Sequence, residues 1–164
     1  MKYIFDMEDV VRRYADTVYR LAVLNTNNKV EADDVFQEVF LKLLRYRESI
    51  TSEEHLKAWL IRVTINQCRS LMSTAWNKRK VSMEAMGTES FEEPVAPETE
   101  DYSDVTEAVM ELPDNYREAI HLFYYEEMSI KEIAIALDAK EPTIKTWLSR
   151  GRQMLKEKLG KEFG

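Results

Sequence analysis

A group of cations and hydroxyls near the carboxyl end of the chain has the spacing of one helix face. These side chains project away from the stripe of Ile144 and Leu148, which a helix would bury against its neighbours. Donors of this kind can contact the phosphates and base edges of duplex DNA when their helix enters the major groove. The group consists of Lys145, Thr146, Ser149, Arg150 and Arg152.

The residues before this group supply the rest of a DNA-reading motif. Ser129-Ile130-Lys131-Glu132 has the pattern of a capping box, in which serine and glutamate satisfy amides at the start of a helix. Residues 138–140 form a turn, and Glu141-Pro142 opens a second helix because proline is tolerated in a first turn. We therefore predict a helix-turn-helix over residues 129–152. The alternative is a solvated basic face on an ordinary helical hairpin.

A predicted helix over residues 31–45 has two contrasting faces. Its apolar stripe, centred on Val35 and Val39, would be buried. The opposite side is polar except for one leucine, which makes it a candidate partner-binding face, although a single exposed leucine is also normal. This side carries Asp34, Gln37, Glu38 and Leu41.

The predicted helix over residues 52–76 mixes cations with aromatic side chains. Such a mixture suits single-stranded nucleic acid, whose phosphates pair with cations and whose bases stack on aromatic rings. The alternative is that the tryptophans belong to the core. The residues concerned are Lys57, Arg62, Arg69, Trp59 and Trp76.

Residues for catalysis or metal binding are scarce. Glu118 and His121 have the spacing found in helical di-iron sites, but the chain has no second pair of this kind, so an ordinary surface helix is the favoured interpretation. The only other histidine is His55, and there is no glycine-rich phosphate loop. The single cysteine, Cys68, excludes an internal disulfide and is expected to be a small buried residue. We expect no catalytic site, metal or cofactor.

Composition and charge indicate a folded protein with an acidic middle. The 164 residues are 45% hydrophobic and 32% charged, with a net charge of −7. Residues 81–104 hold eight acidic and no basic side chains, whereas residues 140–164 hold seven basic and three acidic ones. Apolar periodicity stops over residues 77–104, where glycine and proline occur among glutamates, as is typical of an extended linker.

On either side of this linker the pattern is helical, so we predict an all-α fold of two small helical domains joined by an acidic flexible linker. No apolar run is long enough to span a membrane, and the early Asp6 argues against a secretory signal, so we expect a cytoplasmic protein without direct membrane insertion. The remaining expected helices cover residues 7–24, 103–112 and 113–125.

Three stretches, in this order and spacing, resemble the extracytoplasmic-function (ECF) type of bacterial sigma factor. They are EADDVFQEVFLKL at 31–43, HLKAWLIRVTIN at 55–66, and LPDNYRE at 112–118, which runs into the helix-turn-helix. The resemblance covers nearly the whole chain outside the linker. It implies a subunit without catalytic activity that binds core RNA polymerase and promoter DNA and is controlled by an anti-sigma factor.

The resemblance also implies roles for individual residues. Residues 1–76 would bind core polymerase and the minus-ten element, residues 105–164 would bind the minus-thirty-five element, and the linker 77–104 would follow the RNA exit path. The clamp coiled coil of the largest polymerase subunit would receive Asp34, Gln37, Glu38 and Leu41. The minus-ten element, with one flipped base, would be held by Arg47, Ser49, Thr51, Arg62, Asn66 and Arg69. The minus-thirty-five element would be read by Thr143, Lys145, Thr146, Ser149, Arg150 and Arg152.

The chain departs from the family pattern at several places. Pro142 replaces a small residue, Trp147 replaces an arginine, and Gly151 stands where alanine is common. The loop over residues 48–54 is acidic and lacks the frequent phenylalanine.

Two rival interpretations remain at this stage. One is a free-standing helix-turn-helix regulator, although such proteins usually dimerise and no obvious dimerisation helix follows Arg152. The other is a helical enzyme with Glu118 and His121 as metal ligands.

Overall fold

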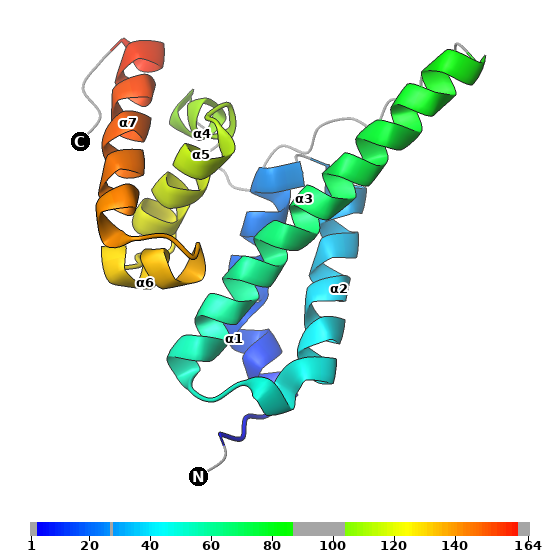
Figure 1. The fold of residues 1–164 in the computed structure, drawn as a ribbon, viewed down its shortest axis with the longest axis vertical. Coiled ribbons are helices and arrows are strands. Elements are labelled where there is room, and N and C mark those ends of the chain that lie inside the picture. The colour runs from blue at the N-terminus through cyan, green and yellow to red at the C-terminus, as the bar shows by residue number, and fades with distance from the viewer. Residues whose placement is uncertain (1–2, 27, 87–103, 161–164) are drawn as a thin grey trace. The chain divides into compact units, whose positions relative to one another are not determined.

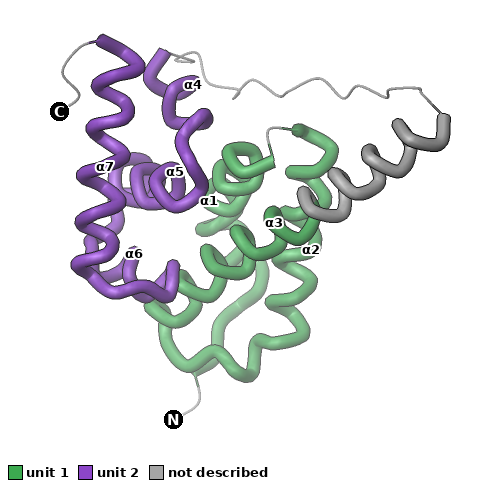
Figure 2. The backbone as a smooth tube through the Cα atoms, turned by 45° about the horizontal axis from the view of Figure 1, so that its top comes forward, with its two compact units in different colours: residues 1–96 green, residues 97–164 purple. Residues whose placement is uncertain are grey.

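The computed structural model describes residues 3–26, 28–86 and 104–160, with the backbone alone for residues 72–86. The chain divides into two compact units, Met1–Ala96 and Pro97–Gly164 (Figure 2). All regular elements among the described residues are helices, in agreement with the predicted fold class. None of the described helices is long and apolar enough to cross a membrane.

Three long helices form the first unit, and each packs against the other two (Figure 1). Their inner faces carry aliphatic side chains at helical spacing, so that one stripe per helix is removed from water. Cys68 belongs to this core and is 1% exposed, which confirms the expectation for the single thiol. The elements are α1 (Met7–Thr26), α2 (Lys29–Tyr46), the 3-10 turn η1 (Arg47–Ser49) and α3 (Glu53–Met86).

The connection between α1 and α2 is shorter than expected. The helix α1 continues to Thr26, whose hydroxyl donates to the carbonyl oxygen of Ala22 at 2.7 Å. The Asn28 side chain then accepts the amide of Glu31 at 3.0 Å and so caps α2. Thr26 therefore closes the last turn of α1, and Asn28 caps α2 two residues later.

Helix α3 is longer than the sequence pattern indicated. It was expected to end at Trp76, but its backbone is helical to Met86. The first ten residues of the expected extended linker are therefore helical. They lack an apolar stripe, yet lysine, arginine, methionine, glutamate and alanine are good helix formers, so helix propensity continues after amphipathicity has ended. The rest of the expected linker, residues 87–103, lies outside the described residues.

The second unit is built around its last helix, which contacts three others of the unit. The buried residues of that helix are Ile144, Leu148, Gly151 and Leu155, as its apolar spacing predicted. The expected helix over residues 113–125 is present, but its second half is a π-helical turn. The elements are α4 (Asp104–Met110), α5 (Asp114–Ile120), the turn η2 (His121–Tyr125), α6 (Ile130–Ala136) and α7 (Glu141–Leu159).

Gly151 lies where α7 packs closely against α5. A Cβ atom added to it would be 2.9 Å from Cγ1 of Ile120, which is closer than side chains normally pack. Ile120 is fully buried, so it has little freedom to move away. The absence of a side chain at Gly151 therefore permits this helix contact.

One carboxylate ties the start of α3 to the start of the chain. Glu53 accepts the hydroxyls of Tyr3 and Tyr14, each at 2.6 Å, and also pairs with the Arg13 guanidinium. The Arg13 guanidinium first, then the two hydroxyls, lower the pKa of Glu53 from 4.5 to about 2. Burial and the same carboxylate raise the pKa of Tyr14. Four residues from three segments are thus joined at this carboxylate.

We expect Glu53→Gln to destabilise the protein by about 1 kcal/mol, or roughly 4 to 8 °C in Tm. Glutamine keeps the shape but removes the charge that Arg13 pairs with, and the effect stays small because both side chains are more than a third exposed to water. Since the pKa of Glu53 is depressed in the folded state, its stabilisation is complete above pH 4.5 and is lost as the pH falls toward about 2. Thermal unfolding followed by circular dichroism across this pH range measures both effects.

The neighbouring Glu54 is exposed and provides the matched control, because Glu54→Gln removes one carboxylate from the same helix turn. Its effect should stay within about 0.5 kcal/mol. Equal losses for the two variants would show that the network adds no specific stability. A Glu53→Gln deficit that persists unchanged at low pH would show that the ionised carboxylate is not the source of the stabilisation.

Candidate nucleic-acid interface

The second unit contains the helix-turn-helix that the sequence predicted. The capping box is present, because the Ser129 hydroxyl accepts the Glu132 amide at 3.1 Å and the Glu132 carboxylate accepts the Ser129 amide at 3.0 Å. Helix α6 ends at Ala136, and α7 begins at Glu141 with Pro142 in its first turn. Asp138, between the two helices, has a φ of 53°, a left-handed conformation that aspartate tolerates better than most residues.

The outer face of α7 is open to water over most of the predicted set. Lys145, Thr146, Ser149 and Arg150 are exposed, while Thr143 is half-buried. The Thr146 hydroxyl donates to the carbonyl oxygen of Pro142 at 3.1 Å. This face therefore presents two cations and two hydroxyls, a set of groups that can bind phosphates and base edges.

Arg152 differs from the other cations of α7. Its Nε donates to the Tyr124 hydroxyl at 2.6 Å, and its guanidinium carbon lies 5.8 Å and 5.6 Å from the ring centres of Phe123 and Tyr124. The sequence pattern placed Arg152 on the outward face, but the side chain is half-buried against η2. In this structure the guanidinium therefore also joins α7 to the turn before α6.

The outer face of α2 is more apolar than the sequence analysis recognised. Leu41 is 50% exposed, and Asp34 and Gln37 are exposed beside it. Val30 and Leu44, which are 60% and 48% exposed, continue the same face four residues before Asp34 and three residues after Leu41. Helical spacing extended by one turn in each direction would have found both.

Glu38, the remaining predicted residue of the α2 face, lies at its edge. It is half-buried, and its carboxylate is 3.8 Å from the Arg45 guanidinium. Together, the α2 outer face consists of Val30, Asp34, Gln37, Glu38, Leu41 and Leu44.

Helix α3 presents a polar face of its own. Arg62, Asn66 and Arg69 are exposed and follow one another at spacings of four and three residues, so they lie along one side of the helix. Trp59 is only half-buried, so the aromatic ring next to this face remains partly accessible. Of the predicted set, Arg62, Arg69 and Trp59 are thus accessible on one helix, while the side chain of Trp76 lies outside the described residues.

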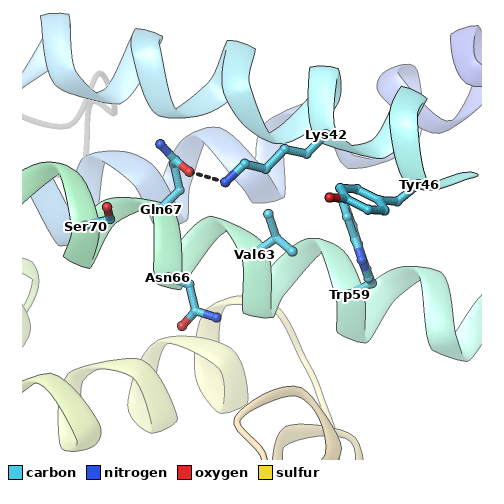
Figure 3. A pocket seen from close by; sticks show the side chains of 7 residues that line it. All are labelled: Lys42, Tyr46, Trp59, Val63, Asn66, Gln67 and Ser70. Atoms are coloured by element: carbon cyan, nitrogen blue, oxygen red, sulfur yellow. Dashed lines mark hydrogen bonds between the residues drawn. The ribbon is translucent and has the colours of Figure 1, made fainter.

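An open pocket of about 450 Å³ lies between the end of α2 and the middle of α3 (Figure 3). Tyr46 and Trp59 lie together at one end of it, and at the other the Lys42 ammonium donates to the Gln67 side chain at 2.6 Å. Asn66 lines the pocket as well. Sequence reasoning had assigned no role to Lys42, Tyr46 or Gln67, because their proximity depends on how α2 and α3 cross.

The loop before α3 is held against the protein at several points. Ile50 is 1% exposed and anchors the middle of the loop in the core. The Ser49 hydroxyl donates to the carbonyl oxygen of Tyr46 at 2.7 Å. The Thr51 amide donates to Nδ1 of His55 at 3.1 Å. The three predicted minus-ten residues of the loop, Arg47, Ser49 and Thr51, are nevertheless exposed.

The pair considered as metal ligands is buried. Glu118 and His121 are 2% and 5% exposed, so the expectation of an ordinary surface helix is wrong at these positions. Nε2 of His121 lies 2.9 Å from a carboxylate oxygen of Glu126, and its ring stacks on Tyr125. Among the described residues there is no group of three or more potential metal-ligating side chains. The geometry therefore favours a structural role for Glu118 and His121, as buried polar residues of the second unit, over a role as metal ligands.

Each of the two units matches the model of a known protein family. The family model of sigma-70 region 2 matches residues 10–78, and that of sigma-70, region 4 matches residues 102–155. The chain is 29% identical over 152 residues to the ECF RNA polymerase sigma factor SigM of Bacillus subtilis, which covers 92% of this chain and 93% of that protein. It is 30% identical over 164 residues to the ECF RNA polymerase sigma factor SigM of Mycobacterium tuberculosis, covering 97% of this chain and 79% of that protein.

Solved structures share the fold. The sigma factor RpoE of Bartonella quintana, crystallised with the anti-sigma factor NepR, matches with a TM-score of 0.76 at 24% identity over 96% of this chain and 98% of that one. CnrH, in complex with the cytosolic domain of CnrY, matches with a TM-score of 0.70 at 21% identity over 94% of this chain and 87% of that one.

Proposed function

This chain belongs to the ECF type of bacterial RNA polymerase sigma factors, and on that premise we propose that the exposed faces of α2, α3 and α7 divide the work of promoter recognition among them. As a sigma factor, the chain is a non-enzymatic subunit that acts with core RNA polymerase and promoter DNA in transcription initiation. The observation that supports this division of work is that three helices, each with an inner face in a core, keep separate outer faces that are exposed to solvent.

The outer face of α7 would read the minus-thirty-five element. Lys145 and Arg150 would pair with phosphates or guanine edges, and Ser149 would donate to or accept from a base edge. Arg152 would reach DNA only if it gave up its bond to Tyr124, so we assign it mainly to holding α7 on η2. The other two members of the set, Thr143 and Thr146, would contact the backbone of the duplex.

The polar face of α3 and the loop before it would bind the minus-ten element. Arg62 and Arg69 would hold the phosphate backbone of the opened strand, and Asn66 would meet a base. The pocket beside Asn66 has an aromatic side chain, Trp59, and polar groups at its ends, and its volume is sufficient for one unpaired nucleobase. The loop residues Arg47, Ser49 and Thr51 would contact the same strand.

The α2 outer face would dock on core polymerase. An apolar centre at Leu41 and Leu44, surrounded by Asp34, Gln37 and Glu38, has the composition of a protein interface with a polar rim. This docking matters for DNA affinity, because a chain with a net charge of −7 is poorly equipped to hold a polyanion alone. Polymerase would supply the affinity, and the sigma subunit would supply the selectivity.

Residues 1–76 and 105–164 would be the two functional domains, and the acidic residues between them would follow the RNA exit path. The structures of RpoE and CnrH each contain a second protein, NepR and the cytosolic domain of CnrY respectively, and NepR is an anti-sigma factor. We propose that an anti-sigma factor likewise holds this chain inactive, and that it works in the cytoplasm, where bacterial transcription takes place.

Run-off transcription with purified core polymerase tests the function directly. The holoenzyme should start transcription at specific sites on a genomic library of promoter fragments, and core polymerase alone should not. A free-standing regulator would instead bind DNA without polymerase, as a dimer on paired half-sites. Dimers in sedimentation analysis, together with specific DNA binding by the chain alone and no binding to core polymerase, would favour that rival.

We expect Leu41→Glu to weaken binding to core polymerase at least tenfold, which is about 1.4 kcal/mol. The change removes an apolar contact and adds a negative charge beside Asp34 and Glu38. Fluorescence anisotropy of the labelled chain titrated with core polymerase measures the dissociation constant. Ile4→Glu makes the same kind of change at a position that is 83% exposed and precedes α1 in the chain, and it should leave binding unaltered. Equal effects at both sites would contradict docking through this face.

We expect Trp147→Arg to make promoter binding by the holoenzyme tighter and more sensitive to salt. One more cation near the phosphates releases about one more counterion, so the slope of log K against log salt should become steeper by about 0.9. Filter binding to a promoter fragment at several salt concentrations gives the slope. Trp147→Gln removes the indole without adding charge and serves as the control. An unchanged slope for Trp147→Arg would place this position away from the DNA backbone.

A further inference from the structure

The loop between η1 and α3 ends in an unusual helix cap. Ser52 precedes the first residue of α3, and its hydroxyl accepts the amide of His55 at 3.0 Å, as in the first half of a capping box. In the usual box the third helical residue is glutamate or glutamine, which reaches back to the amide of the cap residue. Here that position is His55, and its ring reaches one residue further back, to Thr51.

Two groups of Thr51 are within hydrogen-bonding distance of the same ring nitrogen of His55. The Thr51 amide donates to Nδ1 of His55 at 3.1 Å, and the Thr51 hydroxyl is 3.2 Å from the same atom. A nitrogen that accepts an N–H carries no proton itself, so the ring proton of neutral His55 is on Nε2. One acceptor therefore determines the orientation of the last loop residue before the cap.

The other end of this short segment is anchored too. The side chain of Ile50 is buried in the core, and its amide donates to the carbonyl oxygen of Arg47 at 3.3 Å. Thr51 thus lies between a buried neighbour and the His55 ring, yet its own side chain is exposed. The arrangement constrains the backbone while leaving one face of the residue accessible to a ligand.

We propose that His55 is a positioning residue for the minus-ten element, which holds Thr51 so that the loop presents a preformed surface to the opened DNA strand. The proposal rests on the proposed function, because it assumes that the loop binds DNA. His55 itself need not touch DNA. Its contribution is to remove the conformational freedom that the loop would otherwise lose on binding.

A set of three variants tests this role. His55→Asn keeps an acceptor at the δ position, His55→Gln moves the acceptor to the ε position, and His55→Ala removes it. The readouts in the full chain and its holoenzyme are hydrogen exchange of the Thr51 amide by NMR, binding to core polymerase, and open-complex formation, followed by permanganate reactivity of unpaired thymines on a promoter found by run-off transcription.

We expect His55→Ala and His55→Gln to speed exchange of the Thr51 amide and to slow open-complex formation, each by about tenfold, as the loss of one hydrogen bond would do. Binding to core polymerase should be unchanged, and His55→Asn should stay within about twofold of the wild type in all readouts. A cap that only stabilises α3 would instead leave promoter opening unaffected by any of the three changes.

Several results would overturn the proposal. One is open-complex formation as slow in His55→Asn as in His55→Ala, and another is altered amide exchange with unaltered opening. If the wild-type holoenzyme opens no promoter at all, the proposed function fails. In that case an unprotected Thr51 amide in the wild type would independently refute the role of the ring.

Discussion

Helices α2 and α3 each bury one face in the core and expose the opposite face to solvent, and the first unit depends on this arrangement. Burial of Val35, Val39 and Leu43 fixes the rotation of α2 about its own axis, because any other rotation would expose the stripe to water. Leu56 and Leu60 do the same for α3. Once this rotation is fixed, the residues on the opposite side of each helix must face outward. The geometry of both proposed interfaces is therefore set by apolar packing on the opposite sides of the same helices.

The features that sequence analysis predicted well are those with local causes. The capping box at Ser129 and Glu132 involves residues three apart, and the stripe of Ile144 and Leu148 needs only helical spacing. The end of α3 was predicted ten residues too early, at Trp76, because loss of amphipathicity was interpreted as loss of helix. Propensity and burial are separate physical causes of helix formation, and the α3 extension depends on the first.

The features that sequence analysis missed depend on contacts between distant residues. The Arg152 side chain meets Tyr124, 28 positions earlier, and no spacing rule reveals that pair. The pocket on α3 requires α2 to bring Lys42 against Gln67, 25 positions later. His55 lies only four residues from Thr51, but the capping-box pattern expects glutamate or glutamine at its position, so the pattern does not reveal this contact. For these sites, the sequence limits the candidates and the tertiary structure selects among them.

The single thiol of this protein is buried in the core of the first unit. Cys68 is 1% exposed in the first unit, and the chain has no other cysteine. Alkylation requires a solvent-exposed thiolate, so the rate of labelling in the native protein reports how often the first unit opens, while the second unit gives no signal. The chain thus carries an intrinsic chemical probe that separates the opening free energy of one half from that of the other.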